Sequence, residues 1–181
     1  MRILLAFAVL MLTGCGDLVS VEAVANKDNT VFDPALVGAW TSGDAVVIVQ
    51  SGEEESYRIS WLGTEVNTEP PRLIRMEGRL AKLGEQRMLD LSTAEASAGA
   101  FTIPGHVFLR VRPVKDGLKV QFVDSLWMRE QVKASSIAYF TEGFHPVLMA
   151  PSAQVAAFLI KFGFDERALV DPIMLRPLKQ K

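Results

Sequence analysis

Short runs in which apolar and polar residues alternate recur along this chain, and they constrain its fold more than any other feature. The clearest pair is residues 106–112 and 118–122, which are separated by Asp116-Gly117. Alternation with a period of two is typical of strands that bury one face. An Asp-Gly pair is a strong hairpin signal because both of its residues accept a positive φ. The two runs therefore predict antiparallel strands joined by a tight turn.

Further alternating runs predict strands at residues 57–61, 74–80 and 88–92, and short apolar runs predict strands at residues 45–50, 137–140 and 147–150. Gly78, in the middle of one run, predicts a bend or bulge that lets a sheet curl. One helix is predicted to begin with Ser152 as its cap and to end at Gly163. Between them apolar residues recur at spacings of three and four, at Val155, Phe158, Leu159 and Phe162. A last strand is predicted at residues 173–175.

Two other segments carry helix signals. Asp33-Pro34 offers a cap followed by a proline at the first helical position, which predicts a single helical turn. Residues 124–132 are compatible either with a short helix that begins at Asp124 or with a strand that continues through a bulge. Together these patterns predict a mainly β fold with one C-terminal helix. Its antiparallel meander closes into a barrel or forms a strongly curled sheet, which the helix covers.

The N-terminus carries a targeting pattern. Arg2 is followed by an unbroken apolar run from Ile3 to Leu12 and then by Thr13-Gly14-Cys15. A basic start, a short apolar core and small residues are typical of a secretory signal, and ten apolar residues are too few to span a bilayer. With a cysteine directly after the small residues, the pattern resembles the lipobox of bacterial lipoproteins. The resemblance implies cleavage before Cys15 and a diacylglycerol on its thiol.

This resemblance predicts three segments. Residues 1–14 form a signal peptide, residues 15–31 a lipidated flexible tether with a span on the order of 20 Å, and residues 32–181 a single β domain. A short strand within residues 18–24 is the alternative to the tether. In such lipoproteins an Asp directly after the cysteine implies retention in the inner membrane. Gly16 stands there, so we expect a lipid-anchored protein of the bacterial envelope, with the outer membrane favoured.

Composition and motifs exclude several function classes. The formal net charge is −2 and no basic block stands out, so nucleic acid binding has no electrostatic support. Cys15 is the one cysteine, and nucleophile-elbow, phosphate-loop and zinc-helix motifs are absent. The two histidines, His106 and His145, are far apart in sequence, so we expect no metal site. Because no catalytic or cofactor-binding motif is present, we also expect no bound cofactor and no enzymatic activity. Only a cluster of Asp90, His106 and an arginine in a cleft would favour catalysis.

Asp90 lies between two leucines that point inward, so it is expected to face solvent. The alternative is a polar pair with Arg110 or Arg112 at the mouth of a pocket. Either reading depends on which face of the strand the rest of the chain covers.

Aromatic residues on the predicted strands either fill a core, the commoner outcome, or line an apolar cavity. Gly38-Ala39-Trp40 matches the Gly-x-Trp entry to the first strand of lipocalins, and the hairpins, helix and final strand resemble the lipocalin plan. The lipocalin arginine is absent at Pro151-Ser152-Ala153, and so is the Thr-Asp-Tyr loop. The resemblance implies a site for a small apolar or amphipathic ligand, with Trp40, Tyr57, Trp61, Met76, Phe108 and Phe122 as candidates.

The alternative function is a structural or protein-interaction lipoprotein of the envelope with a filled core. Its candidate contact regions are the loops at residues 64–71 and 93–105, because long loops on a rigid scaffold often carry function.

Overall fold

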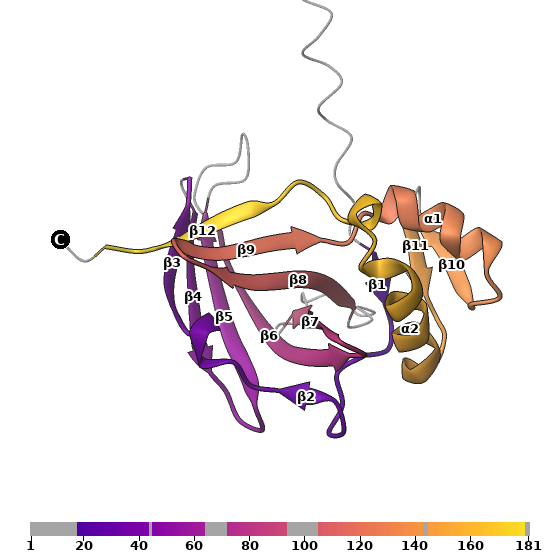
Figure 1. The fold of residues 1–181 in the computed structure, drawn as a ribbon, viewed down its shortest axis with the longest axis horizontal. Coiled ribbons are helices and arrows are strands. Elements are labelled where there is room, and N and C mark those ends of the chain that lie inside the picture. The colour runs from indigo at the N-terminus through magenta and orange to yellow at the C-terminus, as the bar shows by residue number, and fades with distance from the viewer. Residues whose placement is uncertain (1–17, 44, 64–71, 94–104, 143–144, 180–181) are drawn as a thin grey trace, which may run out of the picture.

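The computed structural model describes residues 18–43, 45–63, 72–93, 105–142 and 145–179, and β-structure dominates them (Figure 1). The strands are β1 (Val19–Ser20), β2 (Thr30–Val31), β3 (Gly38–Ser42), β4 (Ala45–Ser51), β5 (Ser56–Gly63), β6 (Arg72–Leu83), β7 (Gln86–Thr93), β8 (His106–Val114), β9 (Gly117–Phe122), β10 (Tyr139–Glu142), β11 (His145–Leu148) and β12 (Ile173–Pro177). The helical elements are η1 (Pro34–Leu36), α1 (Ser125–Ala134), α2 (Ser152–Phe158), η2 (Leu159–Gly163) and η3 (Glu166–Ala168).

The predicted antiparallel barrel is confirmed. Each strand from β3 to β8 pairs antiparallel with its successor along the chain. The last strand, β12, pairs with β9 through Ile173 and Val120 and with β3 through Arg176 and Thr41. These two pairings close a ring of eight strands. Closure leaves no free sheet edge within the ring.

A smaller sheet extends from the barrel along β8. Val19 of β1 pairs with Val107 of β8 on one side and with Val147 of β11 on the other. The β10–β11 hairpin follows, so β1 joins the hairpin to the barrel. Helices α1 and α2 lie on this same side of the molecule (Figure 1). The barrel therefore carries a second layer over part of its outer surface.

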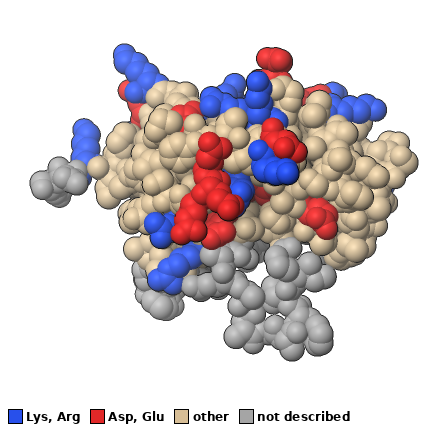
Figure 2. All heavy atoms as spheres, turned by 90° about the horizontal axis from the view of Figure 1, so that it is seen from below, with Lys and Arg blue, Asp and Glu red and all other residues tan. Residues whose placement is uncertain are grey.

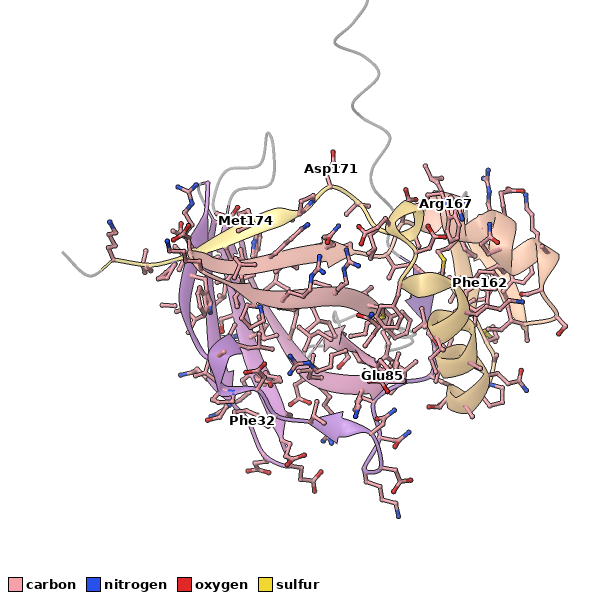
Figure 3. The ribbon with its side chains drawn as sticks, viewed as in Figure 1. Phe32, Glu85, Phe162, Arg167, Asp171 and Met174 are labelled. Carbon is pink, nitrogen blue, oxygen red and sulfur yellow. The ribbon has the colours of Figure 1, made fainter. Side chains whose placement is uncertain are left out.

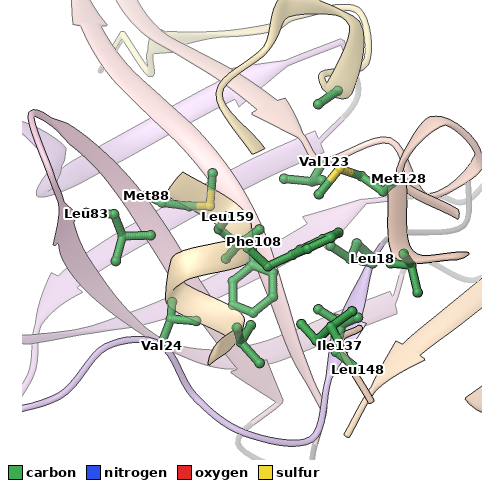
Figure 4. Packing of buried hydrophobic residues seen from close by; sticks show 14 of the residues in the cluster. Leu18, Val24, Leu83, Met88, Phe108, Val123, Met128, Ile137, Leu148 and Leu159 are labelled. Atoms are coloured by element: carbon green, nitrogen blue, oxygen red, sulfur yellow. The ribbon is translucent and has the colours of Figure 1, made fainter. Parts of the chain in front are cut away.

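Two hydrophobic cores result from this arrangement. The barrel core fills the interior with Leu36, Trp40, Val49, Tyr57, Ile59, Leu80, Leu89, Leu91, Leu109, Val111, Leu118 and Val120. The outer core lies between the barrel and the second layer, where Phe108 packs among Leu18, Met128 and Leu159 (Figure 4). Alternation assigns β8 to both cores, because Leu109 and Val111 point inward while Phe108 points outward.

The helices agree with most of the sequence signals. Of the two alternatives for residues 124–132, the helix is the observed one: Asp124 caps α1 by accepting the backbone N–H of Leu126 at 2.8 Å. The apolar stripe of the C-terminal helix is confirmed as a core face, with Val155 and Leu159 fully buried. Ser152 was predicted to cap this helix but is its first residue. Pro151 occupies the N-cap position and makes no side-chain hydrogen bond to the first turn. The predicted turn at Asp33-Pro34 is observed as η1.

The predicted flexible tether is wrong for residues 18–31, which we call the N-terminal segment. Leu18 and Val24 are fully buried in the outer core, β1 lies between two strands, and β2 pairs with β6. The alternative, a strand from Leu18 to Val24, is observed in shortened form as β1. Scattered valines and alanines without a clear period did not favour it, because each strand of this segment is only two residues long. The folded domain therefore includes Leu18, and the boundary at residue 32 is corrected. Cys15 lies outside the described residues.

Candidate functional site

Burial decreases along the barrel interior toward one end. On β4 the side chain of Val49 is buried while Val47 is half-buried, and on β5 Ile59 is buried while Trp61 is half-buried. The same gradient occurs on β6, β8 and β9. We call the half-buried, inward-facing residues at this end the interior rim: Val47, Trp61, Ile74, Met76, Val107 and Phe122. Strands β5 and β7 end here, and β6 and β8 begin here. Residues 64–71 and 94–104, which connect these strands, lie outside the described residues.

The other end of the barrel is closed by η1. Asp33 caps this turn by accepting the N–H of Ala35, and Leu36 is buried in the barrel core. Trp40 donates its indole N–H to the Leu36 carbonyl at 3.1 Å. The Phe32 ring stacks on the Tyr57 ring with centroids 5.1 Å apart. Apolar and polar contacts thus hold η1 against the barrel.

The Tyr57 hydroxyl joins the same closure. It accepts the Asp33 N–H at 2.7 Å, and burial raises the pKa of Tyr57. Seen from the side of β2, the surface carries acidic side chains with basic ones beside them (Figure 2). Two ion pairs involve η1 and the β4–β5 turn: Arg87 pairs with Asp33, the cap of η1, and Arg79 pairs with Glu54.

The six predicted ligand-contacting residues fall in three places. Trp61, Met76 and Phe122 lie at the interior rim, whereas Trp40 and Tyr57 are buried in the barrel core. Trp40 is the strand partner of the rim residue Val47. Phe108 does not line the interior, because the position of β8 that it occupies faces the outer core. Sequence reasoning missed the rim residues Val47, Ile74 and Val107. A signal was available for Ile74, which shares with Met76 the face opposite Arg75 and Glu77. Val47 lies in a continuous apolar run and Val107 precedes Phe108, so alternation did not single them out.

Asp90 is buried rather than solvated, because the N-terminal segment covers the outer face of β7. Its Oδ2 accepts the backbone N–H of Val24 at 2.7 Å and that of Ala25 at 3.0 Å. Its Oδ1 lies 2.7 Å from Nδ1 of His106, which donates because a carboxylate accepts. The Asp90 side chain is 3% exposed and that of His106 20%. The carboxylate therefore fastens the N-terminal segment to β7 and β8.

The carboxylate of Asp90 changes the pKa of His106. The hydrogen bond to Asp90 raises the pKa of His106, burial opposes the shift, and the charges of Asp90 and Glu22 add to it. Protonation of His106 therefore strengthens its attachment to Asp90.

A second polar group lies on the outer face of β8 and β9. The buried guanidinium of Arg110 donates to Oε1 of Gln121 at 2.8 Å and to Oε2 of Glu166 at 3.0 Å. The hydrogen bond from Arg110 lowers the pKa of Glu166, and the charges of Arg110, Arg112 and Lys119 act in the same direction. Arg110 Nε has no hydrogen-bond partner. This group links η3 to the barrel.

The structure brings Asp90 and His106 together but directs Arg110 to Gln121 and Glu166. The Asp–His–Arg cluster that would favour catalysis is therefore not formed by Arg110. Within the described ranges, no group of three His, Cys, Asp or Glu side chains has a metal-binding arrangement.

Comparison with known proteins gives no family assignment: no family of known proteins, no curated protein and no solved structure matches this chain. Among the described residues, no helix is long and apolar enough to cross a membrane.

Proposed function

We propose that this protein is a lipid-anchored envelope protein whose barrel binds a small apolar or amphipathic ligand at the interior rim. One observation carries the ligand-binding part: the burial gradient that leaves Trp61, Met76 and Phe122 half-buried at one end of an apolar interior. Aromatic and thioether side chains are common in apolar binding sites because they combine large contact area with adaptable packing.

The filled interior limits what the rim accepts. Below the rim, Tyr57 and Leu80 are almost fully buried and η1 closes the far end. A long chain that threads the whole barrel has no room, so the ligand is small or inserts only one end. Since the described rim side chains are apolar, binding draws its free energy mainly from burial of apolar surface, about 25 cal/mol per Å2.

The anchor part rests on the N-terminal pattern. The apolar run that ends at Leu12 and the residues Thr13-Gly14-Cys15 resemble a lipobox. One acyl chain gives only marginal membrane binding, and a second chain converts it into a stable anchor. An outer-membrane position is favoured because Gly16 follows the cysteine.

Native mass spectrometry tests the ligand. A chain that begins at Gly16 lacks the cysteine and keeps the whole N-terminal segment, so it is incubated with a mixed lipid extract and sprayed intact. The proposal predicts one small apolar molecule per chain. Absence of any adduct across fatty acids, monoacyl lipids and quinones would contradict it. Intact mass of the protein extracted from bacterial membranes tests the acyl groups on Cys15 separately.

A structural or interaction role is the second candidate. On the outer face of β5 and β6, Leu62 and Leu73 form a cross-strand pair and are 45% and 50% exposed, with Ile48 on the neighbouring strand 43% exposed. Apolar side chains that gather on an outer strand surface favour a contact with another protein. The loops predicted for that contact, 64–71 and most of 93–105, lie outside the described residues. Crosslinking from a photoreactive residue at position 73 in the native membrane would identify a partner.

A further inference from the structure

The point where the chain enters the fold determines how far the domain can lie from its anchor. Leu18 is fully buried in the outer core, and the next residue, Val19, pairs with strands on both of its sides. Only Gly16 and Asp17 separate Leu18 from Cys15. Three residue steps of at most 3.6 Å give a maximum reach of about 11 Å between the two Cα atoms. This is roughly half the span expected of the tether.

Residues after Leu18 do not lengthen the connection between Cys15 and the domain, because they are fixed to the barrel. Asp90 binds the backbone N–H groups of Val24 and Ala25, and Thr30 of β2 pairs with Ala81 of β6. The N-terminal segment is therefore fixed to the barrel at both of its ends. Movement of the domain relative to Cys15 is limited to rotations about the bonds of two residues.

The elements around Leu18 identify the face closest to the anchor. The cluster that buries Leu18 also contains Phe108, whose carbonyl accepts the Val123 N–H at 3.2 Å. Directly after Val123, Asp124 begins α1 and donates its N–H to Ala168 of η3 at 2.8 Å. The first turn of α1 and η3 thus lie next to the chain entry, as Figure 3 shows for Arg167 beside the N-terminal part of α1. We call these two elements the anchor-proximal face.

Side chains on the anchor-proximal face suit a membrane interface. Leu126 is 49% exposed, and the Arg167 guanidinium lies over the half-buried Trp127 ring at 5.4 Å. Trp is enriched at membrane interfaces, and segments that lie in the interface combine Trp or Leu on an apolar face with Lys or Arg beside it. The side of the molecule at β2 carries acidic side chains with basic ones beside them (Figure 2). The anchor-proximal face also includes the exposed Glu166 and the ion pair between Arg167 and Asp165.

We propose that the anchor-proximal face, formed by the first turn of α1 and by η3, docks directly on the lipid bilayer. This inference rests on the proposed acylation of Cys15. The barrel is then held at the membrane surface in a restricted set of orientations instead of ranging at the end of a tether.

Site-specific quenching in vesicles tests the docking. Acylation occupies the only thiol, so single cysteines introduced into the full-length lipoprotein accept a fluorophore selectively. Leu126→Cys reports on the anchor-proximal face, and Glu53→Cys, in the β4–β5 turn, is the matched exposed control. The proteins are reconstituted into phosphatidylethanolamine and phosphatidylglycerol vesicles that contain a lipid with a nitroxide headgroup.

Docking predicts that the label at position 126 loses most of its fluorescence while the label at position 53 keeps most of it. Ten Gly and Ser residues inserted between Asp17 and Leu18 add a span of roughly 17–19 Å and should restore the fluorescence at position 126. Equal quenching at both positions, or no effect of the insertion, would overturn the docking. Flotation and intact mass of each sample show whether the protein is acylated and membrane-bound. A protein without acyl groups overturns the proposed anchor on Cys15 and, with it, the docking.

Discussion

Val24 donates its backbone N–H to the carboxylate of Asp90, 66 residues further along the chain, at a distance of 2.7 Å. The same oxygen accepts the N–H of Ala25, and the other oxygen binds His106. One buried side chain thus connects the N-terminal segment, β7 and β8. These contacts make the N-terminal segment part of the domain, with consequences for stability.

Replacement of Asp90 by Ala should destabilise the protein by about 2–4 kcal/mol, because the buried N–H of Val24, the partly buried N–H of Ala25 and His106 lose their acceptor. Urea unfolding followed by circular dichroism gives the change in free energy of unfolding. Asp28→Ala is the matched control, since Asp28 is exposed in the same segment, and it should change the free energy by less than about 0.5 kcal/mol. Equal effects of both substitutions would contradict the role of Asp90.

Strand alternation predicted much of this fold. The hairpin at Asp116-Gly117, the strands of the barrel and the core stripe around Val155 and Leu159 follow from local patterns. Alternation shows which side chains share a face, but not what covers that face. The burial of Asp90 depends on backbone groups from Val24 and Ala25, which no local pattern connects to β7.

The same limit applies to the candidate site. Phe108 was expected in the interior because it is aromatic and lies on a strand. Its neighbour Leu109 faces the interior, so the alternation of side chains along β8 places Phe108 in the outer core. Trp61 and Met76 were found, because they share the inward face of their strands. Which of the inward residues remain half-buried depends on where η1 closes the barrel, a long-range property.

Stability should depend on pH through His106. Because its pKa is raised above 6.5 in the folded protein, folding favours the protonated ring. The stabilisation is fully present below the unfolded pKa of about 6.5 and is lost as pH rises through the folded pKa. The difference in free energy of unfolding between wild type and His106→Gln should therefore shrink as pH rises from below 6.5. Since His145 is present in both proteins, a difference that is constant or grows with pH would contradict this assignment.

Barrel closure should depend on Gly117. This residue has φ +147°, and a Cβ there would collide with the Leu175 carbonyl of β12. Gly117→Ala should cost about 2–5 kcal/mol, from backbone strain together with overpacking. Gly84→Ala is the control, because Gly84 also has positive φ, +63°, but faces open space; strain alone predicts about 1–2 kcal/mol. Thermal unfolding measures the loss of stability of each variant relative to wild type. Equal losses of stability in the two variants would argue against tight packing between β9 and β12.

Ligand binding at the interior rim is tested most directly by the affinity of a fluorescent fatty acid for three proteins: wild type, Met76→Glu and Leu73→Glu. Both substitutions add a carboxylate to β6, but Met76 lies at the interior rim and Leu73 is 50% exposed on the outer face. Thermal unfolding verifies that each variant is folded, with Trp61→Ala as a second rim variant. Binding at the interior rim predicts one site per chain in wild type and in Leu73→Glu, and at least about tenfold weaker binding in Met76→Glu. Unchanged affinity in the folded rim variants, or no saturable binding by wild type, would contradict it.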